Sequence, residues 1–320
     1  MIISCNPRGK FLERAVRPQP TWKLKLRSGA SRMTIGIGML CARGAVIAAD
    51  TKMANETGAT YFAEKVRVAR STNGAFVAAF AASDVNAART LLDDLFEDLV
   101  AGDPATIREV EELVRPRMAR WVAAYTRHLP EIELILGVSV RAPWVPERNL
   151  RGGVGLYFCQ PPNTMLLKDF LESDPSTYVG IGGGAFVTDP IFSHFFRSMT
   201  HPKAALKQIA YMMYRAKRDH GAYCGGRTNS VFLRETDPAA FEILPVYMDR
   251  AENVGAMLEH VFSIASDAAL SPTIERAEEH CDHLRSYLGL MRGSRELRFL
   301  TQFNQEICED GIVRQLAPEK

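Results

Sequence analysis

Three residues early in the regular part of the sequence have side chains suited to an acyl-transfer site. Asp50 lies sixteen residues after Thr34, and Lys65 lies thirty-one residues after it. A threonine hydroxyl is a weak nucleophile without a base. A free α-amino group has a reference pKa of about 7.7–8.0, so a threonine at a free N-terminus carries both nucleophile and base.

A lysine and an aspartate complete such a site. A lysine ammonium beside the threonine favours the deprotonated amine and stabilises developing negative charge. A buried lysine in turn needs an anionic partner. Each residue also has an ordinary interpretation: Thr34 as a strand former, Asp50 as a strand-end turn residue and Lys65 as a solvated charge. The three gather at one point only if their strands are neighbours.

The hydropathy pattern predicts the elements that position these residues. Apolar residues alternate with Thr34, Gly36 and Gly38, and a continuous small apolar run covers 44–49, both typical of strands. The remaining order is strands, two helices, strands, two helices and strands. Strands are expected at 65–69, 75–81, 134–140, 153–159, 164–167, 177–181, 229–233 and 241–246, and helices from 83 or 84, at 104–128, 187–199 and 203–218. This order suits an α+β fold, a four-layer α-β-β-α sandwich.

The chain divides into three predicted parts. Residues 34–248 form the sandwich domain, and 249–320 form a helical C-terminal extension. Residues 1–33 carry eight Lys or Arg and one acid. They are a removable propeptide, a disordered basic arm, or sequence upstream of a misassigned start codon. We favour the last, because Met33 directly precedes Thr34.

Composition sets broad limits on function. Apolar residues make up 47% and charged residues 24% of the chain, with a net charge of +2. Neither nucleic-acid nor membrane binding is indicated. The six scattered cysteines form no CxxC pair, which favours reduced thiols in the cytoplasm. No apolar run approaches the length of a membrane span.

The opening of the regular sequence resembles a known family. Thr34-Ile35, followed by the run from Gly44 to Thr51, resembles a proteasome beta subunit and the peptidase subunit of the bacterial two-component heat-shock protease. The chain is identified as a divergent bacterial relative of these N-terminal-nucleophile hydrolases. The resemblance implies that Thr34 is the nucleophile, supported by Asp50 and Lys65, and that the backbone N–H near Ala82 is the oxyanion donor. It also implies a homo-oligomeric ring, a peptide or protein substrate, no metal or organic cofactor, and leaves an unfoldase partner open.

Farther along, the sequence departs from the family pattern. Gly183 stands where the family commonly has Ser. The segment from Gly221 to Gly226 resembles Asp-Ala-Tyr-Ser-Gly-Gly, with Gly221 in place of the acid and Cys224 in place of the hydroxyl. These changes remove groups that orient the N-terminal amine. Asp219, two residues earlier, is a candidate replacement for the acid.

Three further patterns receive the simpler interpretation. Residues 180–185 fit G-x-G-x-x-A, but no βαβ crossover precedes them, which favours a tight turn over a dinucleotide site. His280 and His283 share a helix face and could hold zinc, but a solvated face is favoured. Cys224 could be a reactive thiol, but a small structural residue is favoured.

The sequence therefore predicts a threonine-type hydrolase that cleaves peptide bonds through an ester on Thr34. Two alternatives remain open. One is a non-catalytic scaffold subunit in which the residues before Thr34 stay attached. The other is a hydrolase of the same nucleophile class that acts on a small amide.

Overall fold

The structure is a computed structural model, and it describes residues 34–41, 44–54, 60–125, 129–141, 153–169, 178–195, 202–221, 224–237, 240–247 and 249–293. The predicted N-terminal arm, residues 1–33, lies outside these ranges, as does 294–320 of the predicted extension. In the described residues no helix combines the length and the apolar character that a membrane span requires.

The first sheet has five antiparallel strands in the order β10-β1-β2-β11-β12. Its central strands β1 and β2 are buried along their whole length, which explains why both read as apolar and small. The strands are β1 (Gly36–Cys41), β2 (Gly44–Asp50), β10 (Tyr178–Ile181), β11 (Thr228–Asp237) and β12 (Ala240–Tyr247).

The second sheet is an antiparallel meander in the order β5-β6-β7-β8-β9. Its strands are β5 (Val66–Arg70), β6 (Gly74–Ala82), β7 (Ile132–Val140), β8 (Gly153–Gln160) and β9 (Asn163–Asp169). A separate two-stranded hairpin, β3 (Lys52–Ala54) and β4 (Thr60–Phe62), connects β2 of the first sheet to β5 of the second.

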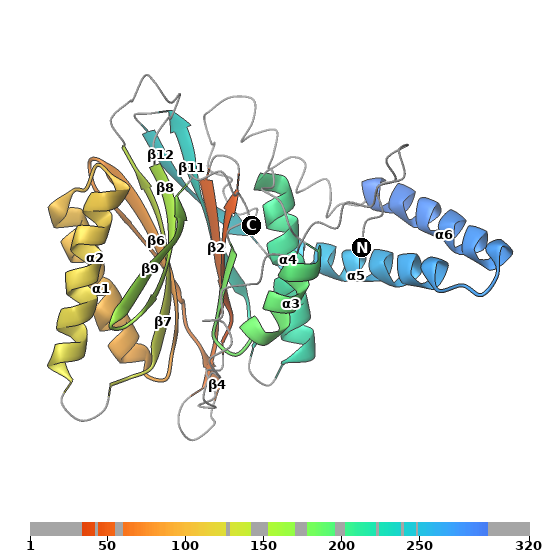
Figure 1. The fold of residues 1–320 in the computed structure, drawn as a ribbon. Coiled ribbons are helices and arrows are strands. Elements are labelled where there is room, and N and C mark those ends of the chain that lie inside the picture. The colour runs from red at the N-terminus through yellow and green to blue at the C-terminus, as the bar shows by residue number, and fades with distance from the viewer. Residues whose placement is uncertain are drawn as a thin grey trace, which may run out of the picture. The chain divides into compact units, whose positions relative to one another are not determined.

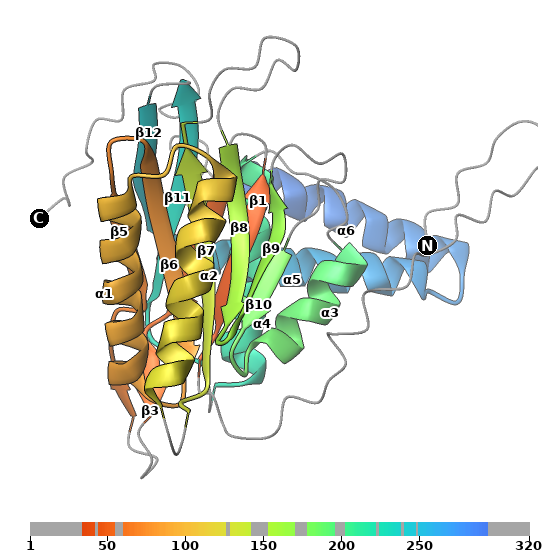
Figure 2. The same cartoon turned by 60° about the vertical axis from the view of Figure 1, so that its left-hand side comes forward.

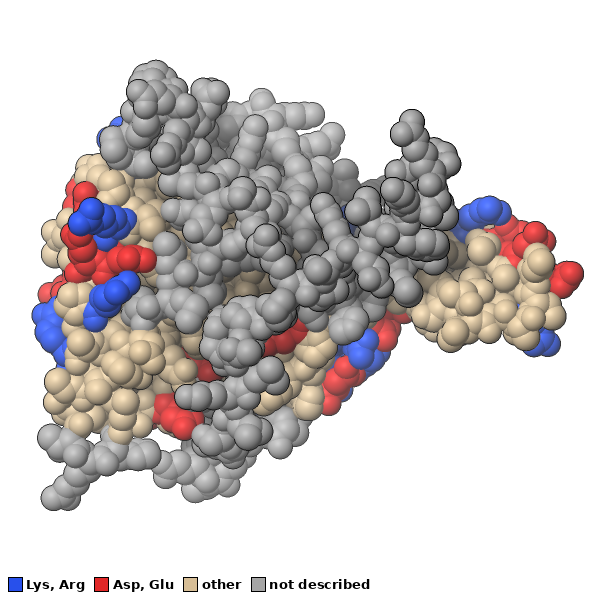
Figure 3. Space-filling model, viewed as in Figure 1, with Lys and Arg blue, Asp and Glu red and all other residues tan. Residues whose placement is uncertain are grey.

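Helices α1 (Val85–Gly102) and α2 (Ile107–Ala124) cover the second sheet (Figure 1). Both begin at good N-caps: the Asp84 side chain accepts from two backbone N–H groups, and Thr106 forms a capping box with Glu109. Their apolar faces pack on β6, β7 and β8 in one core cluster. Figure 3 shows acidic and basic side chains side by side over this region.

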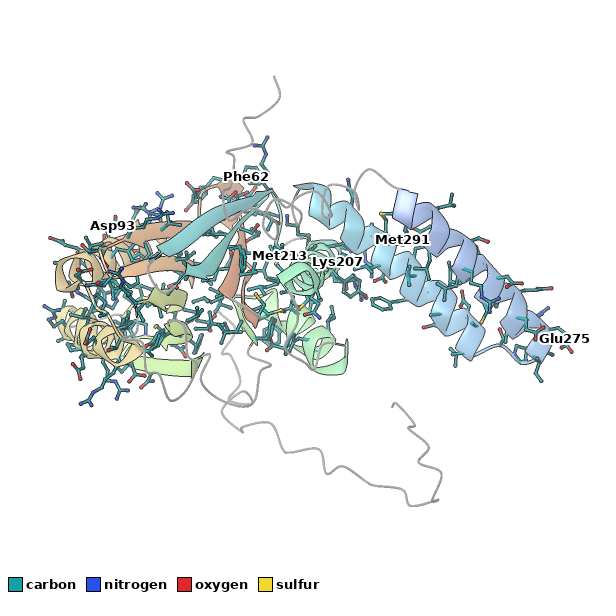
Figure 4. All side chains as sticks on the ribbon, turned by 90° about the horizontal axis from the view of Figure 1, so that it is seen from above. Phe62, Asp93, Lys207, Met213, Glu275 and Met291 are labelled. Carbon is teal, nitrogen blue, oxygen red and sulfur yellow. The ribbon has the colours of Figure 1, made fainter. Side chains whose placement is uncertain are left out.

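Helices α3 (Ala185–Phe195) and α4 (Pro202–Asp219) lie against the first sheet (Figures 1 and 2). Their apolar side chains form a second cluster with β1 and β2, in which Met213 lies between α4 and the sheet (Figure 4). A third cluster fills the space between the two sheets with residues from β2, β6, β7 and β8. Helix α5 (Asp249–Ala269) packs on α4, and α6 (Ile274–Gly293) packs on α5.

The prediction of helices mixed with antiparallel strands is confirmed. Helix boundaries differ from the predicted ones by a few residues: the second helix begins at Ile107 rather than at 104, because Thr106 supplies the cap, and it ends at Ala124. The predicted domain boundaries at 33/34 and 248/249 stay predictions.

Candidate active site

Thr34 lies just before β1 at one end of the first sheet and is 3% exposed. The β1–β2 register pairs Gly36 with Ala49, so one further step brings Ile35 opposite Asp50. The Asp50 N–H donates to the Ile35 carbonyl at 3.1 Å, which continues the ladder. The hairpin therefore places the start of β1 and the end of β2 side by side.

Asp50 is fully buried and accepts four hydrogen bonds. Its Oδ1 accepts from the Thr34 hydroxyl at 2.7 Å, from the Ile35 N–H at 3.1 Å and from the Lys65 ammonium at 2.6 Å. Its Oδ2 accepts from the Gly225 N–H at 2.9 Å. A carboxylate that accepts this many hydrogen bonds is held in one orientation.

Lys65 lies in the loop that leads into β5 of the second sheet, and it is also fully buried. Its ammonium donates to Asp50, to the Thr34 hydroxyl and to the backbone carbonyl of Lys52. Burial lowers the pKa of Lys65 from its ordinary value, and the charge of Asp50 works against that shift. The structure thus brings together the three residues that the sequence singled out.

A glycine turn between β10 and α3 closes over Thr34. The β1–β10 register ends at the Gly36–Ile181 pair, and Gly183 lies in the turn that follows, between Gly182 and Gly184. The Gly184 N–H donates to the Thr34 carbonyl at 3.1 Å. Gly182 has φ +74°, and a Cβ there would lie 2.4 Å from the Thr34 carbonyl oxygen. This turn, rather than a dinucleotide loop, accounts for the G-x-G-x-x-A pattern.

The strand geometry directs the Ala82 N–H toward the Lys65 side of the second sheet. The Ser83 N–H donates to the Glu131 carbonyl on the β7 side, at 3.0 Å. Adjacent residues of a strand direct their N–H groups to opposite edges, so the Ala82 N–H faces the β5 side. The β5–β6 register begins at the Val66–Ala79 pair, and Lys65 directly precedes it.

Asp219, the candidate replacement for the acid that orients the amine, lies away from Thr34 and pairs with arginines instead. Asp219 lies in the last turn of α4, where its carboxylate accepts from Arg215 and Arg218 at 2.9 Å each. The structure therefore does not bring Asp219 into the Thr34 cluster. The Gly221 carbonyl accepts from the Lys52 ammonium at 2.6 Å.

Cys224 lies close to the turn but is buried among apolar side chains. It is 1% exposed, and its N–H donates to the His220 carbonyl at 2.9 Å. Burial raises the pKa of its thiol to about 12. A thiol in that state is a small apolar residue rather than a nucleophile.

Sequence reasoning missed a second buried acid, Glu133 of β7. Its Oε2 accepts from the Gly182 N–H at 2.8 Å, so it contacts the turn that covers Thr34. A usable signal was present in the strand alternation. Glu133 shares its face of β7 with Ile135 and Gly137, which point toward the first sheet, and a carboxylate at such a position is unexpected.

A pocket of about 500 Å³ lies beside the cluster, lined by residues adjacent in sequence to Asp50, Lys65 and Gly225. These lining residues are Thr51, Phe62, Ala63, Glu64, Gly226 and Arg227. Phe62, which pairs with Lys52 at the base of the β3–β4 hairpin, is 67% exposed (Figure 4). In the described residues no cluster of three or more His, Cys, Asp or Glu side chains suits a metal ion. His283 packs its ring against that of His260 on α5, 6.0 Å between centroids.

Two antiparallel sheets with helices, and a threonine held at the start of the first strand by an aspartate and a lysine, define a proteasome-like fold. Solved structures agree with this class. The chain resembles Anbu from Hyphomicrobium sp. strain MC1 at 15% identity and TM-score 0.58, covering 72% of this chain and 96% of that one. It resembles Anbu, described as an ancestral beta-subunit, from Yersinia bercovieri at 13% identity and TM-score 0.58, covering 75% and 99%.

A third neighbour is the helical assembly of the Anbu complex from Pseudomonas aeruginosa, at 16% identity and TM-score 0.55, covering 76% of this chain and 99% of that one. No protein-family model and no curated protein match the sequence. Identities of 13–16% show a shared fold alone.

The identification of the chain as a divergent proteasome beta-subunit-type hydrolase is therefore wrong. The structural neighbours are Anbu proteins, and even those are distant in sequence. The resemblance rested on about fifty residues, and the small apolar runs among them are typical of strands buried on both faces.

Proposed function

We propose that this protein is a threonine-type N-terminal-nucleophile hydrolase that cleaves amide bonds, with peptides as its substrates. The observation that carries the proposal is the buried cluster in which the hydroxyl of Thr34 donates to Asp50 and accepts from Lys65. Buried charged groups are costly unless they are paired. Here both members of the buried ion pair, Asp50 and Lys65, contact the Thr34 hydroxyl, which needs such neighbours to act as a nucleophile.

The proposed reaction begins when removal of the preceding residues frees the Thr34 amine. The amine takes the hydroxyl proton, through a water, while Oγ1 attacks the substrate carbonyl carbon. The Ala82 N–H stabilises the oxyanion, and Lys65 stabilises the same developing charge. The C–N bond breaks as the leaving amine takes the proton, and water then hydrolyses the Thr34 ester. Asp50 keeps Lys65 oriented and charged.

The four-layer α-β-β-α sandwich belongs to this proposal. It is supported by the three core clusters, one beneath each helix pair and one between the sheets. We also propose that identical chains assemble with one another. One structural neighbour is a helical assembly, so an open helical stack is proposed as an alternative to the ring expected from the sequence.

The test combines the state of the N-terminus with labelling. Intact mass of the protein from its native host shows whether the chain begins at Thr34. A β-lactone then acylates a nucleophilic hydroxyl by ring opening, and peptide mapping locates the ester. We expect the ester on Thr34 and its loss in Thr34→Ala. Labelling that persists in Thr34→Ala contradicts the proposal.

One observation favours a second function. Thr34 is only 3% exposed and is joined by a peptide bond to Met33 in the full sequence, which blocks the proposed base. A chain that keeps its first 33 residues, assembles and is not labelled would be a non-catalytic scaffold subunit. Native mass spectrometry with the same labelling experiment separates the two functions.

A further inference from the structure

Glu133 is a carboxylate in the layer between the two sheets. Along β7 the residues Ile132, Leu134 and Leu136 pack toward α1 and α2, whereas Ile135 packs toward the first sheet. Side chains alternate along a strand, so Glu133 shares the inward face with Ile135. It is 3% exposed. An acid at such a position is costly to bury and needs a specific compensation.

One hydrogen bond of Glu133 connects it to the turn beside Thr34. Its Oε2 accepts from the Gly182 N–H at 2.8 Å. Gly182 is in the left-handed region and lies against Thr34, so no side chain fits between them. Two residues on, the Gly184 N–H donates to the Thr34 carbonyl. The carboxylate thus anchors, across the sheet interface, the turn that holds the nucleophile's backbone.

The charges at this end of the sheets bear on the same relation. In the described residues the buried charged side chains are Asp50, Lys65 and Glu133. Asp50 and Lys65 form an ion pair at 2.6 Å. A freed Thr34 amine adds one positive charge, and a nearby negative charge such as that of Glu133 favours the charged amine.

We propose that Glu133 is a positioning residue for the Thr34 amine, holding the Gly182–Gly184 turn in place and favouring the ammonium form by its negative charge. This inference rests on the proposed function, because it requires a free amine at Thr34. Lys65 favours the neutral amine and Glu133 the charged one. These two opposed effects keep the pKa of the Thr34 amine near neutral pH, where a general base is most effective.

Other titratable groups face the same region, and they are unchanged in the variants below. They are Asp50 from β2, Lys65 before β5, Cys224 after α4, and Lys52 and Lys217 farther out.

The test measures the rate of Thr34 acylation by the β-lactone as a function of pH, in the full chain and in two variants. Glu133→Gln keeps an acceptor oxygen for the Gly182 N–H but removes the charge. We expect its maximal rate to stay within about three-fold of wild type, and its acid limb to move down by about one pH unit. Glu133→Ala removes both, and we expect its maximal rate to fall by about ten-fold or more.

Ser139→Ala is the matched control. Ser139 lies on the same face of β7, is 1% exposed, and pairs with Ala75 and Val154 toward the other end of the strand. We expect its rate and pH profile to match wild type. If Glu133→Ala does not fold, as judged by circular dichroism, the pH shift of Glu133→Gln decides alone.

The outcomes separate this inference from the proposed function. Wild type labelled at Thr34, with a Glu133→Gln profile that superimposes on it, overturns the role of Glu133 and leaves the hydrolase intact. A wild-type chain with a free Thr34 amine that is not labelled overturns the hydrolase, and the role of Glu133 with it.

Discussion

The ammonium of Lys65 donates to the hydroxyl of Thr34, although the two residues belong to different sheets. Thr34 leads into β1 of the first sheet, and Lys65 leads into β5 of the second. The candidate site therefore exists only when the two sheets are stacked. Anything that loosens the sheet interface should lower reactivity before it unfolds either sheet.

Removing Lys65 is expected to affect both reactivity and stability. Lys65→Ala takes away the donor to the Thr34 hydroxyl, and we expect β-lactone labelling to slow by about 10²–10³-fold. It also leaves Asp50 buried without its ion-pair partner, which should cost about 3–5 kcal/mol of unfolding free energy. Labelling kinetics and urea denaturation measure the two effects separately.

Lys207→Ala is the control for loss of a lysine. Lys207 lies on α4, where Figure 4 labels it, and is partly exposed. Its replacement should change the unfolding free energy by less than about 0.5 kcal/mol. A Lys65→Ala protein that is labelled at the wild-type rate would remove Lys65 from the proposed mechanism.

The buried lysine also predicts a pH dependence of stability. Burial lowers the pKa of Lys65 in the folded chain. The reference pKa of a lysine in an unfolded chain is about 10.4. Between these two pKa values the unfolded state binds more protons, so stability contributed by this group rises as pH rises.

The comparison of wild type with Lys65→Met at alkaline pH measures that contribution, because the variant lacks the titrating lysine. We expect the unfolding free energy of wild type to rise relative to that of Lys65→Met as pH approaches the pKa of an unfolded lysine. A difference that stays constant, or that shrinks with rising pH, contradicts the lowered pKa of Lys65.

Gly182→Ala tests the contact between the glycine turn and the nucleophile. A Cβ at this position meets the Thr34 carbonyl oxygen at 2.4 Å, and φ is +74°. The added methyl must displace Thr34 or the turn, so we expect labelling to fall by about 10²-fold or more. Stability should fall by about 1–3 kcal/mol from the strained backbone.

Gly289→Ala makes the same chemical change in α6, where a Cβ meets nothing within 4 Å. Alanine is the better helix former, so this variant should gain about 0.5–1 kcal/mol and keep its labelling rate. Equal labelling in both glycine variants would show that the turn does not position Thr34.

Arg117 joins α2 to α1 through two acids. It donates to Asp98 at 2.7 Å and to Asp94 at 2.9 Å, and its side chain is 18% exposed. Arg117→Ala should cost about 1–3 kcal/mol, because partly buried charged hydrogen bonds are lost. Arg108→Ala, which removes an exposed ion pair with Glu112, should cost about 0–0.5 kcal/mol.

The stability contributed by the Arg117–Asp98 pair should also depend on pH, and the direction of that dependence follows from the pKa of Asp98. The hydrogen bond from Arg117 holds the pKa of Asp98 below its ordinary value. A lowered carboxylate pKa contributes stability that is present above the unfolded value of about 3.9 and is lost as pH falls below it. Thermal melts should therefore show a smaller acid-induced loss in Arg117→Ala than in wild type.

Thiol reagents should distinguish a cysteine nucleophile from a threonine one. Burial raises the pKa of both Cys224 and Cys41 to about 12, whereas Cys281 is exposed on α6. We expect iodoacetamide at pH 8 to modify Cys281 before either buried thiol. Peptide mapping locates the adducts, and β-lactone labelling of Thr34 should survive. Loss of labelling upon alkylation of Cys224 would argue for a thiol in the mechanism.

The local pattern was enough to identify the strands of the two large sheets, but not the short β3–β4 hairpin between them. Alternation and apolar runs predicted β1, β2 and β6, and the spacing of Thr34, Asp50 and Lys65 singled out the cluster. Strand and helix periodicity are properties of neighbouring residues, so they are readable without the fold. Which roles the three side chains perform stays a proposal.

Only the tertiary structure decided which acids lie near Thr34 and the turn that covers it. Asp219 is two residues from Gly221 in sequence, but the helical turn directs it to Arg215 and Arg218. Glu133 is forty-nine residues from Gly182, yet the stacking of the sheets brings them to 2.8 Å. Sequence determined which residues each strand presents on each face. Contacts between sheets depend on how those faces meet, and that follows from packing of the whole core rather than from any local pattern.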